Sequence, residues 1–364
     1  MTSPLVTRLL DDLASEPDPV VCASKCAELA CYWARVGEFD EAERIRADLR
    51  RDFGDGRSVR VSVQIMVLEA LILYFRDLGF GARDRLVRAN LLSRASHDKW
   101  LIATTAAWMA HIDFNANEFD SMKTSCDVCF DAMQNSDHAS ECRVSIVLGD
   151  AFLFCGEKSV SQRWYERARV AALRVGDHAA LGAMIYNRAA LRVAGCRIQQ
   201  AAGLGSAVGV AEAKVEIKSA INYQFAARLK SLDHLLQSAH IGILVLEENF
   251  TEALRIIDHL LELRSVPLDS AQLRLLQSDK CLCLAMIGDV KGAAECGDLF
   301  NNLDLGILPA DDRALILNSL ARAATAINDL DAANRLGLAC RSAIEQHNAT
   351  IQKLHLVLRD YCRV

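Results

Sequence analysis

Four residues of metal-binding types lie close together in the sequence. Cys126 and Cys129 are separated by two residues, and His138 and Cys142 follow. Cysteine sulfur and histidine nitrogen are the usual ligands of structural zinc, so these side chains could hold a zinc ion. The alternative is that the cysteines fill small positions in a hydrophobic core. The repeat described below favours the core positions, and we expect no bound metal.

Sequence patterns typical of enzymes are missing. None of the nine histidines follows a glutamate by three residues or precedes another histidine by four, and no Gly-x-Ser-x-Gly motif is present. The glycine-rich segment 203–209 could contact a phosphate, but no strand pattern precedes it and no Gly-Lys-Ser/Thr sequence follows. We expect no cofactor and no catalytic residue. An enzyme whose groups converge from distant parts of the chain is the least supported alternative.

The composition is that of a globular, helix-rich protein. Of the 364 residues, 52% are apolar and 24% are charged, and only five are proline, which interrupts helices. The net charge is −6, and no run rich in lysine and arginine is present. Binding to nucleic acid requires a basic surface, so we expect no nucleic-acid partner.

The sequence also predicts a cytoplasmic protein with no membrane contact. The segment 1–19 lacks the apolar stretch of a signal peptide. The most apolar segment, 144–156, contains Asp150 and is shorter than the roughly 20 residues that cross a bilayer. Thirteen cysteines in a chain without an export signal indicate a reducing compartment, in which thiols stay free.

A short phrase recurs along the chain with a period near 40 residues. Its first copy, 37–42, reads Gly-Glu-Phe-Asp-Glu-Ala, and related copies begin at Asn117, Glu248, Gly288 and Asn328. Glycine or asparagine can adopt the left-handed conformation that ends a helix, and the acidic residues that follow suit the start of the next helix. The phrase therefore predicts the turn between two helices. Weaker turns are expected at three further glycines, Gly79, Gly156 and Gly195.

These repeats resemble the tetratricopeptide repeat family. Before Gly37 stand Leu29, Ala30 and Trp33, with the family's Leu-Gly-x-x-Tyr spacing, and Leu148, Gly149 and Phe152 stand in the same way before Gly156. The period is longer than the family's 34 residues and is similar to that of the sensing regions of bacterial transcription activators and peptide-pheromone receptors. The resemblance implies an all-α superhelix of about eight antiparallel helix pairs. We expect it to span residues 1–345, with an irregular insertion at 196–235 and a capping helix at 346–364.

The repeat also gives the cysteines a structural role. Cys126 and Cys129 lie nine and twelve residues after Asn117, where the family buries contacts of the second helix, and Cys340 lies twelve after Asn328. Cys281 occupies the slot that Ala30 and Gly149 hold in other repeats. We therefore expect these cysteines to pack in the core.

The resemblance further implies a binding surface on the concave side of the array, which the first helix of each pair lines. Counting back from each turn, the polar residues on that side are Arg35, Arg76, His111, Asn115, Arg143, Asp150, Arg192 and Arg322. Arginine suits carboxylates or phosphates because its planar fork donates two parallel hydrogen bonds. The alternative is a solvated helix face on which Glu69, Asp77 and Asp150 neutralise the arginines.

The leading functional hypothesis is a regulatory or scaffold module that binds another protein or peptide, such as an acidic or C-terminal segment, on its concave face. A sensor of small molecules is the second hypothesis, because long-period arrays similar to this one accept ligands in their channel. The sequence does not define the oligomeric state.

Overall fold

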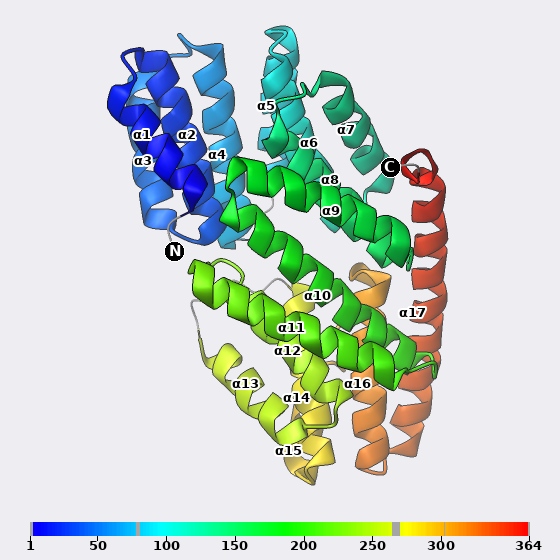
Figure 1. Cartoon of the computed structure of the whole chain (residues 1–364). Coiled ribbons are helices and arrows are strands. Elements are labelled where there is room, and N and C mark those ends of the chain that lie inside the picture. The colour runs from blue at the N-terminus through cyan, green and yellow to red at the C-terminus, as the bar shows by residue number, and fades with distance from the viewer. Residues whose placement is uncertain (1–2, 78–80, 264–269, 302, 363–364) are drawn as a thin grey trace. The chain divides into compact units, whose positions relative to one another are not determined.

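The protein is all-α in the computed structural model, which describes residues 3–77, 81–263, 270–301 and 303–362. It is 84% helical, and the described residues form seventeen α-helices and two short 3-10 helices but no strand (Figure 1). Consecutive helices pack against one another, as in an α-helical solenoid. The predicted fold class is therefore confirmed. Gly79 lies outside the described residues.

The helices belong to two compact units, which we describe separately. Unit 1 contains residues 1–187, 222–233 and 354–364, and unit 2 contains residues 188–221 and 234–353. The first ten helices are α1 (Pro4–Ser15), α2 (Pro19–Val36), α3 (Phe39–Phe53), α4 (Val59–Asp77), α5 (Ala82–Ala95), α6 (Lys99–Asn115), α7 (Phe119–Ala132), α8 (His138–Phe154), α9 (Lys158–Val175) and α10 (His178–Ala201). They are followed by α11 (Ala207–Ala227), α12 (Asp233–Leu246), α13 (Phe250–Glu262), α14 (Ser270–Met286), α15 (Val290–Asp298), α16 (Ala310–Ala326) and α17 (Leu330–Val357).

Unit 1 consists of two layers of helices. Helices α2, α4, α6 and α8 contact one another in that order and form the inner layer. Helices α3, α5, α7 and α9 each pack on the inner helix that precedes them and form the outer layer. Figure 1 shows these helices in order from blue to green. This arrangement places the first helix of every pair on the same side.

The predicted turns explain the pairing. Gly37 ends α2 with a φ of +87°, and its neighbour Glu38 donates its N–H to the carbonyl of Trp33 at 2.9 Å. A side chain at position 37 would lie 2.8 Å from the backbone nitrogen of Ser231, so only glycine fits. The left-handed conformation recurs at the other predicted turn residues that lie in the described part of the chain, apart from Gly195: Asn117, Gly156, Glu248, Gly288 and Asn328.

The turn predicted at Gly195 is wrong. Helix α10 continues through Gly195 to Ala201, and the left-handed residue that follows the helix is Gly203. A glycine inside a helix lowers the stability of the helix by only about 1 kcal/mol relative to alanine, so the helix can continue through it when the flanking residues favour helix. The glycine-rich segment 203–209 is therefore the connection to α11, and the segment expected to be irregular, 196–235, consists mostly of regular helix.

The small-residue slot of the repeat also has a visible cause. A side chain at Gly149 on α8 would lie 2.8 Å from the ring of Tyr165 on α9, so the two helices approach too closely for a larger residue. Ser161 on α9 donates its hydroxyl to the Gly149 carbonyl at 2.8 Å. The close approach at Gly149 and this hydrogen bond join α8 to α9.

The chain end belongs to α17 rather than to a separate helix. Helix α17 runs without interruption from Leu330 to Val357, across the boundary expected at residue 345, and a short 3-10 helix, Arg359–Tyr361, follows. Leu354, Leu358 and Tyr361 are buried in the core of unit 1, where the Trp164 indole donates to the Tyr361 carbonyl at 3.2 Å.

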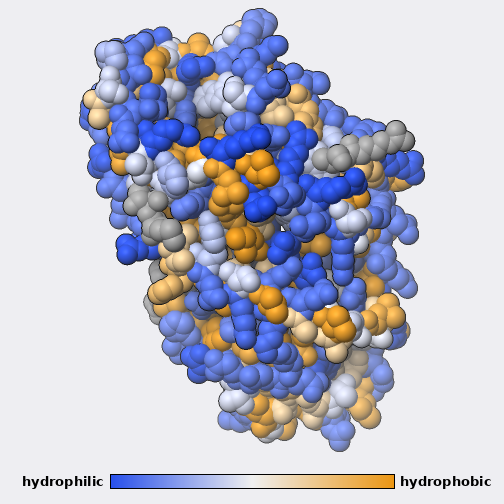
Figure 2. All heavy atoms as spheres, viewed as in Figure 1, coloured by the Kyte–Doolittle hydropathy of each residue, from blue (hydrophilic) through white to orange (hydrophobic). Residues whose placement is uncertain are grey.

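No helix among the described residues is long and apolar enough to span a membrane. Figure 2 shows hydrophilic side chains over most of the visible face, with apolar residues in small groups between them.

Candidate functional site

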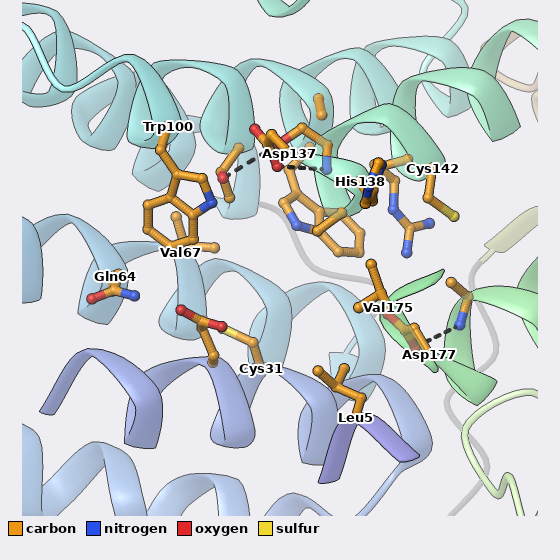
Figure 3. Close-up of a pocket in the computed structure, with 18 of the residues that line it drawn as sticks. Leu5, Cys31, Gln64, Val67, Trp100, Asp137, His138, Cys142, Val175 and Asp177 are labelled. Atoms are coloured by element: carbon orange, nitrogen blue, oxygen red, sulfur yellow. Dashed lines mark hydrogen bonds between the residues drawn. The ribbon is translucent and has the colours of Figure 1, made fainter. Parts of the chain in front are cut away.

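The inner layer of unit 1 borders a partly open cavity of about 320 Å³ (Figure 3). Helices α2, α4, α6 and α8 line it, together with α1 and the connections that precede α8 and α10. The lining combines aromatic and aliphatic side chains such as Val67, Leu71 and Trp100 with several charged groups. This composition is typical of binding sites for small ligands, in which an apolar wall surrounds a few polar groups.

Arg143 is the least solvated charged group of the cavity. It projects from α8, its relative exposure is 5%, and its guanidinium carbon lies 3.9 Å from the ring centre of Trp108 on α6. Among the described residues it has no ion-pair partner. Burial and the nearby charge of Arg35 lower the pKa of Arg143 to about 10. The side chain therefore stays charged at neutral pH, with an indole face as its main compensation.

Trp108 belongs to a cluster of aromatic rings. The rings of Trp108 and His111 meet edge to face with centres 5.7 Å apart, and the Tyr74 ring packs on His111 at 5.4 Å. Asn115 donates to the Tyr74 hydroxyl at 2.8 Å. Burial, with a smaller effect from Arg143, lowers the pKa of His111 to about 3. His111 is therefore neutral and positions Trp108 rather than titrating.

Arg35 on α2 lines the same cavity but is neutralised. Its guanidinium lies 2.7 Å from the carboxylate of Asp177, and each of the two side chains is 11% exposed. The other carboxylate oxygen of Asp177 accepts the N–H of Ala180 and caps α10. The pair links α2 to the start of α10, so Arg35 has a structural role as well as a place in the lining.

Acidic and amide groups also line the cavity. Glu28 on α2 is partly buried, and burial raises its pKa to about 7 with a smaller contribution from the nearby Asp137. Asp137 caps α8 by accepting the N–H of Ser140 at 3.2 Å, while its second carboxylate oxygen is buried without a hydrogen bond. Gln64 donates to the Ser24 carbonyl, and its side-chain oxygen is likewise buried without a partner.

The structure brings together two of the eight predicted site residues, Arg35 and Arg143, and places His111 and Asn115 behind Trp108. The other four lie outside the cavity. Arg76 pairs with Glu43 at 3.0 Å, and Asp150 accepts hydrogen bonds from the Tyr165 hydroxyl and the Asn187 amide, both at 2.7 Å.

The remaining two predicted residues belong to unit 2. Arg192 on α10 pairs with Glu212 and Glu216 on α11, at 2.7 and 2.9 Å. Arg322 on α16 donates to the Gln200 side chain at 3.3 Å. Glu69, which we considered as a neutralising group, instead binds three other arginines, Arg46, Arg50 and Arg85. The side chain of Asp77 lies outside the described residues.

The candidate zinc ligands do not converge. Cys126 and Cys129 are buried in the core between α6, α7 and α8, His138 faces Glu141 at 3.2 Å, and Cys142 lines the cavity. In the part of the chain that the structure describes, no three cysteine, histidine or acidic side chains are grouped to hold a metal ion. Burial raises the pKa of the Cys129 thiol to about 12, so it stays protonated.

Sequence reasoning missed Glu28, Asp137 and Trp108. Two signals could have indicated them. Trp108 lies three residues before His111 and therefore on the same helix face, and Asp137 directly precedes α8 as a typical N-cap. Glu28 has no such signal.

The fold and the cavity together define an all-α protein of repeat-like architecture with a partly open cavity on its inner layer. Comparison of the sequence with known protein families and with curated proteins found no match.

Proposed function

We propose that the protein is a tetratricopeptide-like binding module of regulatory or scaffolding function, and that unit 1 receives an anionic group of its partner in the cavity beside Arg143. The observation that carries this proposal is Arg143 itself: a desolvated cation with no ion-pair partner among the described residues, held over Trp108. A buried charge is costly unless it is paired. An unpaired buried arginine is therefore expected where the anionic group of a ligand supplies the missing partner.

The layered arrangement supports the proposed location. The cavity lies on the helices that begin each pair, which is the side that repeat arrays use to bind partners. A peptide segment that ends in a carboxylate, or carries an acidic side chain, would meet Arg143 with a charge-assisted hydrogen bond.

The size of the cavity favours a second candidate, a sensor of small molecules. A volume of about 320 Å³ is at the lower end of the range of small-molecule sites and accommodates a small ligand or the last residues of a chain. Both candidates share the chemistry of an anionic group at Arg143. We further propose that the protein works in the cytoplasm, which its thirteen free cysteines support.

A thermal-shift screen tests the proposal. Small carboxylates, small phosphates and short peptides with free C-termini would be compared on the wild type, on Arg143→Met and on Arg76→Met. Arg76 is the matched control because it is a predicted groove arginine that lies outside the cavity and pairs with Glu43. We expect compounds that stabilise the wild type and Arg76→Met but not Arg143→Met. Whether peptides or small molecules give the larger shift separates the two candidates, and stabilisation that is insensitive to Arg143→Met would contradict both.

A further inference from the structure

The cavity contains charges of opposite sign that the protein leaves apart. Glu28 and Arg143 both line it, yet among the described residues no ion pair joins Glu28 to Arg143 or to Arg35. Opposite charges in a partly desolvated space attract strongly, so a fold built only for stability would bring them together or dispense with them. We therefore distinguish an acidic pole at Glu28 and a basic pole at Arg143, each of which is available to a charged group of a ligand.

The acidic pole is centred on Glu28. The unpartnered oxygens of Asp137 and Gln64 lie among the same lining residues and add negative potential that no donor screens. Three cations, Arg8, Arg60 and Lys25, act on Glu28 and lower its pKa, but none of them forms an ion pair with it among the described residues. Arg60 pairs with Asp98 instead, and Lys25 pairs with Asp12 and Glu16. A cationic group placed beside Glu28 would therefore gain an ion-pair partner.

The basic pole is centred on Arg143, because Asp177 neutralises Arg35. Figure 3 shows Gln64 and Trp100 toward one side of the cavity, and Cys142 and Asp177 toward the other. Apolar side chains, among them Val67 and Leu71, make up much of the wall. A ligand with two charged groups on a compact apolar body fits this distribution.

We propose that the cavity binds a small bipolar ligand of amino-acid type, with its carboxylate at Arg143 and its ammonium group at Glu28. The inference rests on the proposed function, to which it adds the second pole and the chemical class. A ligand that carries one charge satisfies one pole and leaves the other desolvated and unpaired, so the bipolar ligand is selected over either half.

Calorimetric titration with three forms of one molecule tests this selection. The probes are L-leucine, N-acetyl-L-leucine, which lacks the ammonium group, and L-leucinamide, which lacks the carboxylate; the methionine and phenylalanine series repeat the test with other apolar bodies. We expect each amino acid to bind at least about tenfold more tightly than either derivative, since each derivative lacks one of the two charge-assisted hydrogen bonds.

Two variants assign the poles. Glu28→Gln should abolish the preference for leucine over N-acetyl-leucine, and Arg143→Met should abolish the preference over leucinamide. Binding to the wild type near pH 6 should also release a proton, because Glu28, whose pKa is about 7, must ionise to pair with the ammonium group. Titration in buffers of different ionisation enthalpy measures this release, which Glu28→Gln should lack.

The outcomes separate the two proposals. If the N-acetyl forms bind as tightly as the amino acids and depend on Arg143, the bipolar ligand is wrong and the proposed function stands. If the amides bind best and Arg143→Met has no effect, the anionic site fails as well. If no probe of any series binds, the amino-acid class is overturned, and the carboxylate and phosphate screen alone decides the proposed function.

Discussion

Replacing Arg143 with methionine removes the charge but keeps an unbranched side chain that can still pack on Trp108. The pKa of Arg143 falls from 12.5 to about 10. Since a shift of one pKa unit corresponds to about 1.4 kcal/mol, burial and Arg35 destabilise the charged form of Arg143 by about 3 kcal/mol. The contact with the Trp108 face returns about 2 kcal/mol of this cost. We therefore expect Arg143→Met to raise the free energy of unfolding by about 1 kcal/mol, which for a chain of this length raises Tm by about 1 to 2 °C.

The matched variant Arg35→Met should act in the opposite direction. It leaves the Asp177 carboxylate, 11% exposed, without its guanidinium partner at 2.7 Å. Breaking a buried ion pair by removing one partner costs about 3 to 5 kcal/mol. Urea unfolding followed by circular dichroism at neutral pH, without added ligand, measures both variants against the wild type.

The two substitutions should therefore change the free energy of unfolding in opposite directions. Such a result would show that Arg35 stabilises the fold, whereas Arg143 lowers stability, as expected of a binding residue. A loss of stability in Arg143→Met as large as that in Arg35→Met would refute this reasoning, because Arg143 would then be a structural residue.

Three further predictions concern the interior. Burial raises the pKa of Asp150 from 3.8 to about 7, so the folded state holds a proton that the unfolded state loses, and stability should fall as pH rises through this window. From about pH 5 to about pH 8 the wild type should lose about 3 kcal/mol more than Asp150→Asn, as measured by urea unfolding at the two pH values. In unit 2, Arg197 donates to both carboxylate oxygens of Asp279, at 2.9 and 2.6 Å. Asp279→Ala should lower the free energy of unfolding by about 3 to 5 kcal/mol, because it leaves the buried Arg197 without its ion-pair partner. Cys126→Ala and Cys129→Ala should each cost about 1 to 2 kcal/mol of packing without changing the metal content measured by elemental analysis.

Controls for these predictions lie on the surface. Arg169→Ala removes an exposed pair with Glu166 and should leave stability almost unchanged, in contrast to Asp279→Ala. Equal pH dependence of the wild type and Asp150→Asn would show that Asp150 is ionised in the folded protein. One bound zinc per chain, lost in Cys126→Ala, would restore the metal interpretation.

Much of the fold was predictable because its turns depend on local chemistry. Gly37 and Asn117 occupy the left-handed conformation that their residue types favour, and they end helices where the repeat predicts. The error at Gly195 has the same origin: one glycine does not show whether the neighbouring turns of helix continue, and two further glycines, at 203 and 205, were also available to end α10.

The site was predictable only in part. Arg35 and Arg143 could be selected because their distance from the turn fixes which side of the helix they occupy. Whether each arginine is paired depends instead on carboxylates from other parts of the chain. Glu43 pairs with Arg76, and Asp177 pairs with Arg35. The pattern along a single helix does not predict these partners. Arg143 was not distinguishable from Arg76 in the sequence, although only Arg143 is buried without an ion-pair partner among the described residues.

A crystal structure of the protein grown with the tightest-binding carboxylate probe tests the central claim most directly. We expect ligand density in the cavity of unit 1, with a carboxylate within about 3 Å of the Arg143 guanidinium and the Trp108 ring unmoved. An empty cavity with the probe bound elsewhere on the chain, or density in the cavity with the carboxylate turned away from Arg143, would contradict the account.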